Sequence, residues 1–226
     1  MSDLTDLLIK LIPILPLLAV ISNGLLGSRY SHEMAHRLAW GSVGLSFLCV
    51  IGVFADILRT GTAREVVAYQ WIFGGDLTIN LAYLVDPLTC VMLLVVTGVG
   101  FLIHVYSVGY MHGEPGFTRF FIYMNLFMVS MLLLVMGNNY VVLFIGWEGV
   151  GLCSYLLIGY YYDKVSAAKA ATKAFVVNRI GDAGFLLAIF LIFVNFKTLD
   201  YTKVFAQAGQ LSPDMATAIA LCLLVG

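Results

Sequence analysis

The sequence has 226 residues, of which 61% are hydrophobic and only 11% are charged. Soluble globular domains typically contain about 25% charged residues, so this composition indicates a membrane protein whose surroundings are a lipid bilayer. The formal net charge is −1, and a chain so close to neutral offers no basic surface for nucleic acid.

Apolar runs long enough to cross a bilayer divide the chain. A crossing helix needs about 20 apolar residues, and the runs predict six such helices, at residues 7–27, 38–58, 83–105, 120–137, 140–162 and 167–196. The first is expected to be a retained span, because two acids precede it and no small-residue cleavage site follows. The predicted fold is an all-α membrane protein, with one transmembrane domain over residues 1–226.

Two shorter elements and an incomplete helix accompany these spans. Residues 64–86 alternate apolar and polar side chains around Gly74-Gly75, which predicts a β-hairpin at the membrane surface between the second and third spans. Residues 197–210 predict a short interfacial helix. A seventh apolar run covers residues 215–226, about 18 Å of helix where a crossing needs about 30 Å. We therefore expect the chain to be the N-terminal fragment of a longer protein.

The cysteines and glycine-rich segments carry no signature of a cofactor site. Cys49, Cys90, Cys153 and Cys222 lie in separate apolar segments, without the paired spacing of zinc, iron–sulfur or disulfide frameworks. We interpret them as packing residues. The G-x-G runs at 149–151 and 98–100 do not follow a strand of a βαβ unit, so they are not nucleotide fingerprints. We expect no redox centre, cofactor or metal on this chain.

Ionisable residues inside the fifth and sixth predicted spans are the main functional candidates. Glu148 lies in the fifth span, and Lys173, Arg179 and Asp182 lie in the sixth. Such a group costs about 2.5–3.5 kcal/mol on insertion scales, so it usually faces protein or water and has a function. A short loop makes the two helices antiparallel neighbours, which places Glu148 and Asp182 about 21 and 22 Å from the connecting ends. The two carboxylates are therefore expected at the same depth.

Helical periodicity groups further polar residues with these charges, because residues three, four and seven apart share a face. On the fifth helix, the face of Glu148 continues through Tyr155 to Tyr162 near one membrane surface. The sixth helix has a basic face that consists of Lys169, Thr172, Lys173 and Arg179.

Two interpretations of the buried charges remain open. In a proton relay, a cation near Glu148 changes whether that carboxylate holds a proton. In the structural alternative, Arg179 and Asp182 form an ion pair, and a protonated Glu148 is hydrogen-bonded to a neighbouring residue.

Other residues in the spans have weaker claims to function. His104, near the end of the third span, is a possible relay residue or an anchor at the membrane interface. Trp147 and the tyrosines at 160–162 are interpreted as packing or interfacial aromatics.

Four motifs resemble a known family. They are GWEGVGLCSYLLIGYYY (146–162), KAFVVNRIGDAGF (173–185), VTGVGFLIHVYSVGYM (96–111) and RFFIYMNLFMVSML (119–132). They are similar to the L subunits of bacterial respiratory complex I and to their mitochondrial counterparts. The resemblance implies an antiporter-like subunit of the membrane arm, in the bacterial inner membrane, next to other membrane-arm subunits. NADH, FMN, the iron–sulfur clusters and quinone would then belong to partner subunits.

The resemblance also implies roles for individual residues. Glu148 corresponds to the buried acid of the family's proton channel, with Asp182 and Arg179 nearby and Lys173 at the start of their motif. The family pairs this glutamate with a lysine on the seventh helix, in a stretch expected just beyond Gly226.

Three hypotheses follow for the function. The first is a proton-translocating subunit of an NADH:quinone oxidoreductase, which makes the chain part of an enzyme. The second is a stand-alone cation/proton antiporter subunit of the Mrp-like class, without a redox partner. The third is a bundle without transport activity, in which the buried charges only fix the helix register.

Overall fold

The computed structural model describes residues 2–27, 29, 31–74 and 77–226. Within these residues, six helices are long and apolar enough to cross a membrane, and two strands form one antiparallel sheet. The predicted all-α membrane fold with a small β-hairpin is therefore confirmed. The elements are α1 (Ser2–Leu26), α2 (His32–Thr60), β1 (Arg64–Gly74), β2 (Leu77–Val85), α3 (Pro87–Tyr110), α4 (Phe117–Met136), α5 (Tyr140–Ile158), α6 (Val165–Phe196), α7 (Tyr201–Gln207), a 3-10 turn (Ala208–Gln210) and α8 (Pro213–Val225).

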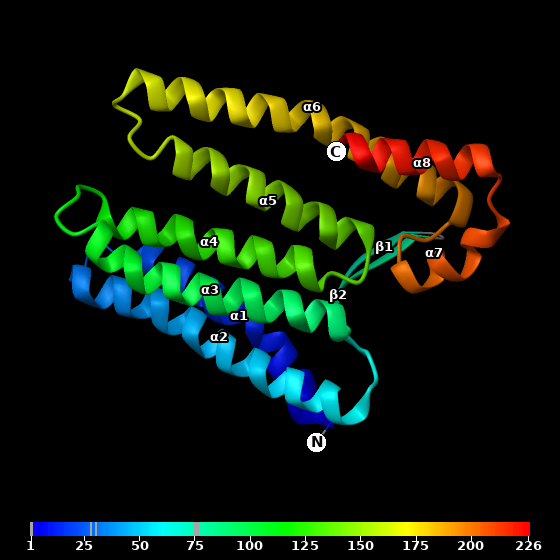
Figure 1. Cartoon of the computed structure of the whole chain (residues 1–226), viewed down its shortest axis with the longest axis horizontal. Coiled ribbons are helices and arrows are strands. Elements are labelled where there is room, and N and C mark those ends of the chain that lie inside the picture. The colour runs from blue at the N-terminus through cyan, green and yellow to red at the C-terminus, as the bar shows by residue number, and fades with distance from the viewer. Residues whose placement is uncertain (1, 28, 30, 75–76) are drawn as a thin grey trace.

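The long helices lie side by side (Figure 1). Helices α1 to α4 pack against one another, α5 packs on α4, α6 packs on α5, and α8 lies along α6. The hairpin and α7 lie at the same end of the molecule (Figure 1). Helices α5 and α6 therefore form an outer layer on a four-helix group.

Helix α3 begins later than the sequence predicts. Pro87 occupies its first turn, where a missing N–H leaves no helical bond unmade, and the Asp86 carboxylate accepts a 2.7 Å hydrogen bond from the Thr89 N–H. The predicted start at residue 83 is wrong, because Tyr83 belongs to β2. The sequence suggests the earlier start because the residues next to Tyr83 in β2 are as apolar as those at the beginning of a span.

Helix α5 ends at Ile158, before the predicted end at Tyr162. The residues that follow form a turn, in which the Tyr160 side chain is buried and its hydroxyl donates to the Pro115 carbonyl at 3.1 Å. Tyr162 is therefore not on the helical face of Glu148, and the predicted stripe ends with α5.

The hairpin is joined to the helices through the α4–α5 connection. Its strands pair from Arg64 opposite Val85 to Gly74 opposite Leu77, and the predicted Gly74-Gly75 turn lies partly outside the described residues. At the junction, Asn139 Nδ2 donates to the Asn80 carbonyl at 2.9 Å. The hairpin thus holds the start of α5.

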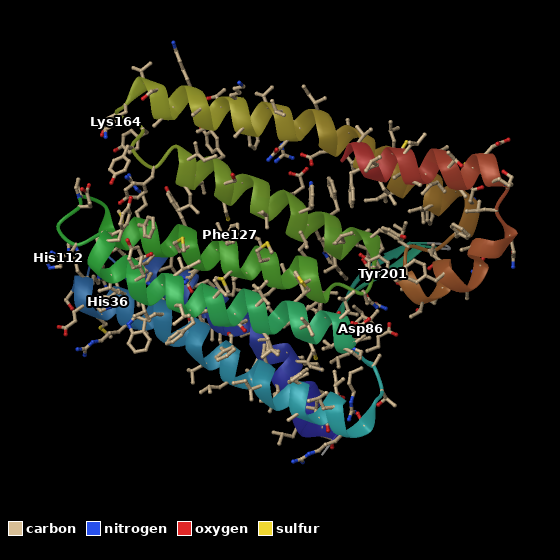
Figure 2. The ribbon with its side chains drawn as sticks, viewed as in Figure 1. His36, Asp86, His112, Phe127, Lys164 and Tyr201 are labelled. Atoms are coloured by element: carbon tan, nitrogen blue, oxygen red, sulfur yellow. The ribbon has the colours of Figure 1, made fainter. Side chains whose placement is uncertain are left out.

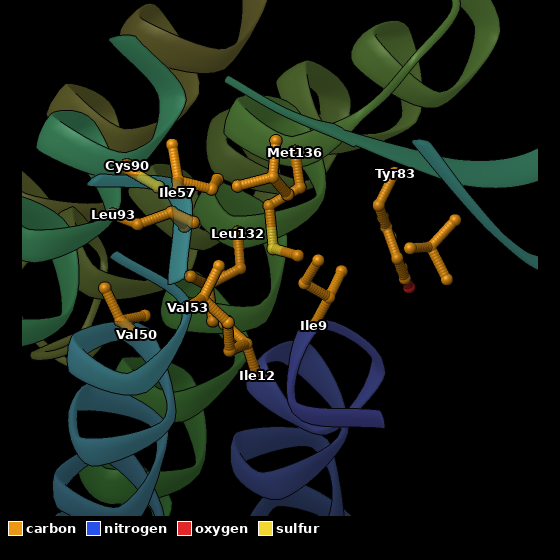
Figure 3. Packing of buried hydrophobic residues seen from close by; sticks show 12 residues of the cluster. Ile9, Ile12, Val50, Val53, Ile57, Tyr83, Cys90, Leu93, Leu132 and Met136 are labelled. Atoms are coloured by element: carbon orange, nitrogen blue, oxygen red, sulfur yellow. The ribbon is translucent and has the colours of Figure 1, made fainter. Parts of the chain in front are cut away.

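The largest core cluster lies between α1, α2, α3, α4 and the hairpin (Figure 3). In a bilayer the lipid is as apolar as these side chains, so close packing and dispersion stabilise such contacts more than removal from water does. The cluster contains Ile9, Ile12, Val50, Val53, Ile57, Val66, Tyr83, Val85, Cys90, Leu93, Leu132 and Met136.

Outer faces of the long helices are apolar, whereas polar side chains collect toward their ends. Leu102 and Phe190, for example, are 64% and 60% exposed. Figure 2 shows His36, His112 and Lys164 at one end of the molecule and Asp86 and Tyr201 at the other. This distribution is typical of helices that cross a bilayer.

Candidate functional site

The candidate site lies where α5 faces α6. An Arg179 Nη1 ion pair holds Glu148 Oε2, and the same Nη1 lies 3.5 Å from Asp182 Oδ2. One guanidinium therefore bridges carboxylates on two helices. The shared contact places Glu148 and Asp182 at the same depth, as the sequence predicts.

Two glycines explain why Glu148 faces away from α4. A Cβ on Gly146 would lie 2.5 Å from the Leu134 backbone nitrogen, and one on Gly149 would overlap Ser130. Helix α5 therefore approaches α4 along its glycine side. At 100° per residue, Glu148 lies about 160° around α5 from Gly146 and about 100° from Gly149, so the G-W-E-G run turns its polar residue off the α4 side and toward α6.

Trp147 belongs to the site, although its place in an apolar span predicts a packing or interfacial aromatic residue. Its Nε1–H donates to Asp182 Oδ1 at 3.0 Å. Its ring stacks on Phe185, with 6.0 Å between ring centroids and 5° between planes. The overlooked signal was its place next to Glu148, since an indole N–H in a span needs an acceptor.

The three charged side chains differ in exposure. Asp182 is 5% exposed, and the side chains of Glu148 and Arg179 are 22% and 40% exposed. The guanidinium carbon of Arg179 lies 4.5 Å from the centroid of the Phe175 ring, in cation–π contact. An open cavity of about 440 Å³ adjoins them, lined also by Trp147 and by the end of α8. Water or another helix could reach the carboxylates from this cavity.

Lys173 and Lys169 do not join the site. Both are exposed on α6, in a separate groove of about 570 Å³ that also contains Tyr162. Neither lysine forms an ion pair with any described residue. The structure thus brings Glu148, Arg179 and Asp182 together and leaves the two lysines nearer the α5–α6 turn.

Tyr155 lies between the site and that turn. Its ring contacts Phe175 with 5.4 Å between centroids, and Phe175 also contacts Arg179. On its other side, Tyr155 lines a cavity of about 210 Å³ with Arg119 and Tyr160. It therefore borders the smaller cavity directly and reaches the site only through Phe175, which lines the larger one.

His104 lies away from the site, on α3 among the four packed helices. It is fully buried, its Nδ1 is 2.7 Å from the Gly100 carbonyl oxygen, and its ring contacts Phe121 of α4. Its Nε2 has no hydrogen-bond partner among the described residues. Any relay through His104 would need a path across α4 to α5.

The described residues contain no group of three or more histidine, cysteine, aspartate or glutamate side chains arranged to hold a metal ion.

Two family models match the chain. Residues 71–121 match NADH-ubiquinone oxidoreductase (complex I), chain 5 N-terminus, and residues 137–226 match the membrane domain described as NADH:quinone oxidoreductase/Mrp antiporter. The second match contains both helices of the candidate site. The chain belongs to the complex I chain 5 family. The resemblance drawn from the sequence motifs is confirmed.

Curated relatives of this family share much of the chain. Proteins named NADH-quinone oxidoreductase subunit L are 47% identical in Mycobacterium tuberculosis (89% of this chain, 32% of the relative) and 42% identical in Pseudomonas aeruginosa (97% and 37%). The Escherichia coli K12 subunit L is 42% identical (84% and 31%). The chain thus spans about a third of the length of these relatives.

Two solved structures share the fold. One is the membrane-bound sulfane sulfur reductase, an archaeal respiratory membrane complex, with a TM-score of 0.83 and 19% identity over 96% of this chain and 43% of that chain. The other is the Mrp complex from Dietzia, with a TM-score of 0.75 and 23% identity over 98% and 23%. At these identities the likeness shows the fold alone.

The six apolar helices and the family's membrane domain also settle the location of this family member. It is an integral, multi-pass protein of the bacterial inner membrane.

Proposed function

We propose that this chain acts in a proton-translocating membrane subunit of an NADH:quinone oxidoreductase, with residues 1–226 as one transmembrane domain. Its relatives named subunit L support this assignment. The partners are the other membrane-arm subunits, and they hold NADH, FMN, the iron–sulfur clusters and quinone. The chain itself contributes proton-carrying side chains and no redox centre.

The observation that carries the proposal is one guanidinium shared by two carboxylates on neighbouring membrane spans. With Glu148, Asp182 and Arg179 all ionised, the cluster has a net charge of −1. A net charge is costly in a medium of low dielectric constant, and one added proton neutralises the cluster. The site is therefore suited to binding and releasing one proton.

Each residue has a distinct role in this mechanism. Glu148 accepts the proton, because it is more exposed than Asp182 and borders the open cavity. Arg179 supplies the counter-charge while Glu148 is ionised and remains beside Asp182 after Glu148 is neutralised. Asp182 keeps the guanidinium in place during the exchange.

The remaining candidates lie along routes to this cluster. Tyr155, Lys173 and Lys169 line the cavities toward the α5–α6 turn and would pass protons between that membrane surface and Glu148. His104 would serve a separate branch through the four-helix group, where its free Nε2 can hold a water molecule or a proton.

Replacing Glu148 by Gln in the full-length subunit tests the assignment. NADH-driven proton pumping by the assembled complex in membrane vesicles should fall at least tenfold, with assembly intact. Glu33→Gln is the matched control, because it removes only an exposed ion pair with Arg37. Near-normal pumping by a verified Glu148→Gln complex would show that Glu148 is not the proton acceptor.

A stand-alone cation/proton antiporter is the second candidate, favoured by the Mrp family description and the Mrp structural neighbour. Sodium-dependent proton transport by the purified complex without NADH dehydrogenase activity would support it. Co-purification with that activity supports the first function.

The bundle without transport activity remains as the third candidate, since ion pairs also fix helix register. It predicts that Ala at Glu148, Lys173 and Asp182 leaves NADH-driven proton pumping by the assembled complex unchanged.

A further inference from the structure

We propose that Trp147 is a positioning residue of the proton site, whose indole N–H holds Asp182 so that Arg179 stays available to Glu148. The inference rests on the proposed function, because it concerns the same cluster. It assigns a role to a residue that composition and periodicity classify only as aromatic packing.

The argument begins with the two oxygens of Asp182. Oδ1 accepts the 3.0 Å bond from Trp147 Nε1, whereas Oδ2 is 3.5 Å from Arg179 Nη1. Charge-assisted N–H···O bonds are usually 2.7–2.9 Å long, so the arginine contact with Asp182 is the weaker of its two carboxylate contacts. Of these two nitrogen donors, the indole N–H is the nearer to Asp182.

Removing the indole N–H would change the partner of Arg179. Asp182 is 5% exposed, and a buried carboxylate oxygen without a donor is costly. Arg179 lies on the same helix, three residues before Asp182, and can turn toward it without moving either helix. Glu148 would then lose its counter-charge.

The indole is held firmly enough to direct its N–H. The Phe185 ring stacks with two aromatic rings of α5, Trp147 at 6.0 Å and Phe144 at 5.7 Å between centroids, with interplanar angles of 5° and 14°. Phe185 and Asp182 are three residues apart and share one face of α6. Helix α6 therefore contacts Trp147 twice, through a stacking ring and through a hydrogen-bond acceptor.

The two contacts can be separated experimentally. Incorporating benzothienylalanine at position 147 of the full-length subunit keeps the size and stacking of the indole and replaces its N–H by sulfur. Trp147→Phe removes the N–H and also replaces the indole by a smaller ring. The same replacement at Trp40, whose ring contacts Phe101 on another face of the bundle, is the matched control.

Two readouts are needed in the assembled complex. The infrared carboxylate stretch of Asp182, assigned by its loss in Asp182→Asn, should shift when the N–H is removed. NADH-driven proton pumping should fall about tenfold, the effect of losing one hydrogen bond to a charged group. When benzothienylalanine is combined with Asp182→Asn, pumping should be no lower than in Asp182→Asn alone. The Trp40 control should leave both the infrared band and pumping unchanged.

Different outcomes overturn different steps. An unchanged Asp182 band, or normal pumping with benzothienylalanine together with loss in Trp147→Phe, overturns the proposal, because the ring alone would then matter. If the Asp182 band shifts with benzothienylalanine but the Glu148→Gln complex pumps normally, the proposed function is overturned. The contact by which Trp147 positions Asp182 is then still supported.

Discussion

Replacing Asn139 by Ala should destabilise the helix that carries Glu148. The Asn139 Oδ1 accepts from the backbone N–H groups of Val141 and Val142 at 3.1 and 2.9 Å, which caps α5. Its Nδ2 donates to the Asn80 carbonyl at 2.9 Å and to Asn138 Oδ1 at 2.7 Å. Asn139 is 1% exposed, so water cannot replace these bonds readily.

The magnitude follows from these four contacts. Loss of an N-cap costs about 1 kcal/mol, and each of the two donated bonds contributes about 1 kcal/mol. We expect Asn139→Ala to lower the free energy of unfolding by about 2–4 kcal/mol. Asn139→Asp keeps the capping oxygen and loses both donated bonds, so it should cost about 2 kcal/mol, roughly two thirds of the loss in Asn139→Ala.

Unfolding by SDS in mixed detergent micelles, followed by tryptophan fluorescence, measures this free energy on the full-length subunit. Asn195→Ala is the control, because Asn195 is exposed and its side chain donates only within its own helix, to Leu191. If Asn139→Ala and Asn195→Ala unfold at the same SDS fraction, the junction does not stabilise α5 and the reasoning is refuted.

Two further predictions concern packing and pH. Gly146→Ala places a Cβ 2.5 Å from the Leu134 nitrogen and should cost about 1–3 kcal/mol in the same titration, whereas Gly41→Ala, with no atom within 4 Å, should not destabilise; equal stability of the two variants would contradict the close approach of α5 to α4. Burial, and secondarily Tyr140, raises the pKa of Tyr201 above its usual value of about 10. The stability from its neutral phenol should be complete below pH of about 10 and lost as the pH rises through the higher folded pKa. Absorbance at 295 nm follows the phenolate, and the part of this band that Tyr201→Phe removes belongs to Tyr201. If that part appears near pH 10, the pKa of Tyr201 is not raised and the prediction is contradicted.

The membrane fold could be predicted largely from local sequence. In lipid, backbone groups must bond within their own segment, so an apolar run of about 20 residues becomes a helix whatever its neighbours are. The ends were less predictable. Tyr83 and Tyr162 are apolar enough for a span, but the strand pairing of Tyr83 and the turn around Tyr160 depend on other parts of the chain.

The candidate site was predicted in outline. Glu148 and Asp182 are detectable because a carboxylate in an apolar run is rare and costly, and a short loop alone sets their common depth. The basic face of α6 was the weaker prediction, because sharing a face with Arg179 does not bring Lys173 to the carboxylates. His104 has the right chemistry for a relay, yet it lies among other helices.

By itself, the sequence determined that this protein is a bundle of membrane helices with charges buried in two of them, because span length and polarity are local properties of the chain. Only the tertiary structure decided which groups meet. The contacts of Arg179 with both carboxylates and of Trp147 with Asp182 depend on the rotation of α5 against α6. That rotation is set by the glycine contacts with α4 and the stacking on Phe185, and no periodicity within a single helix contains it.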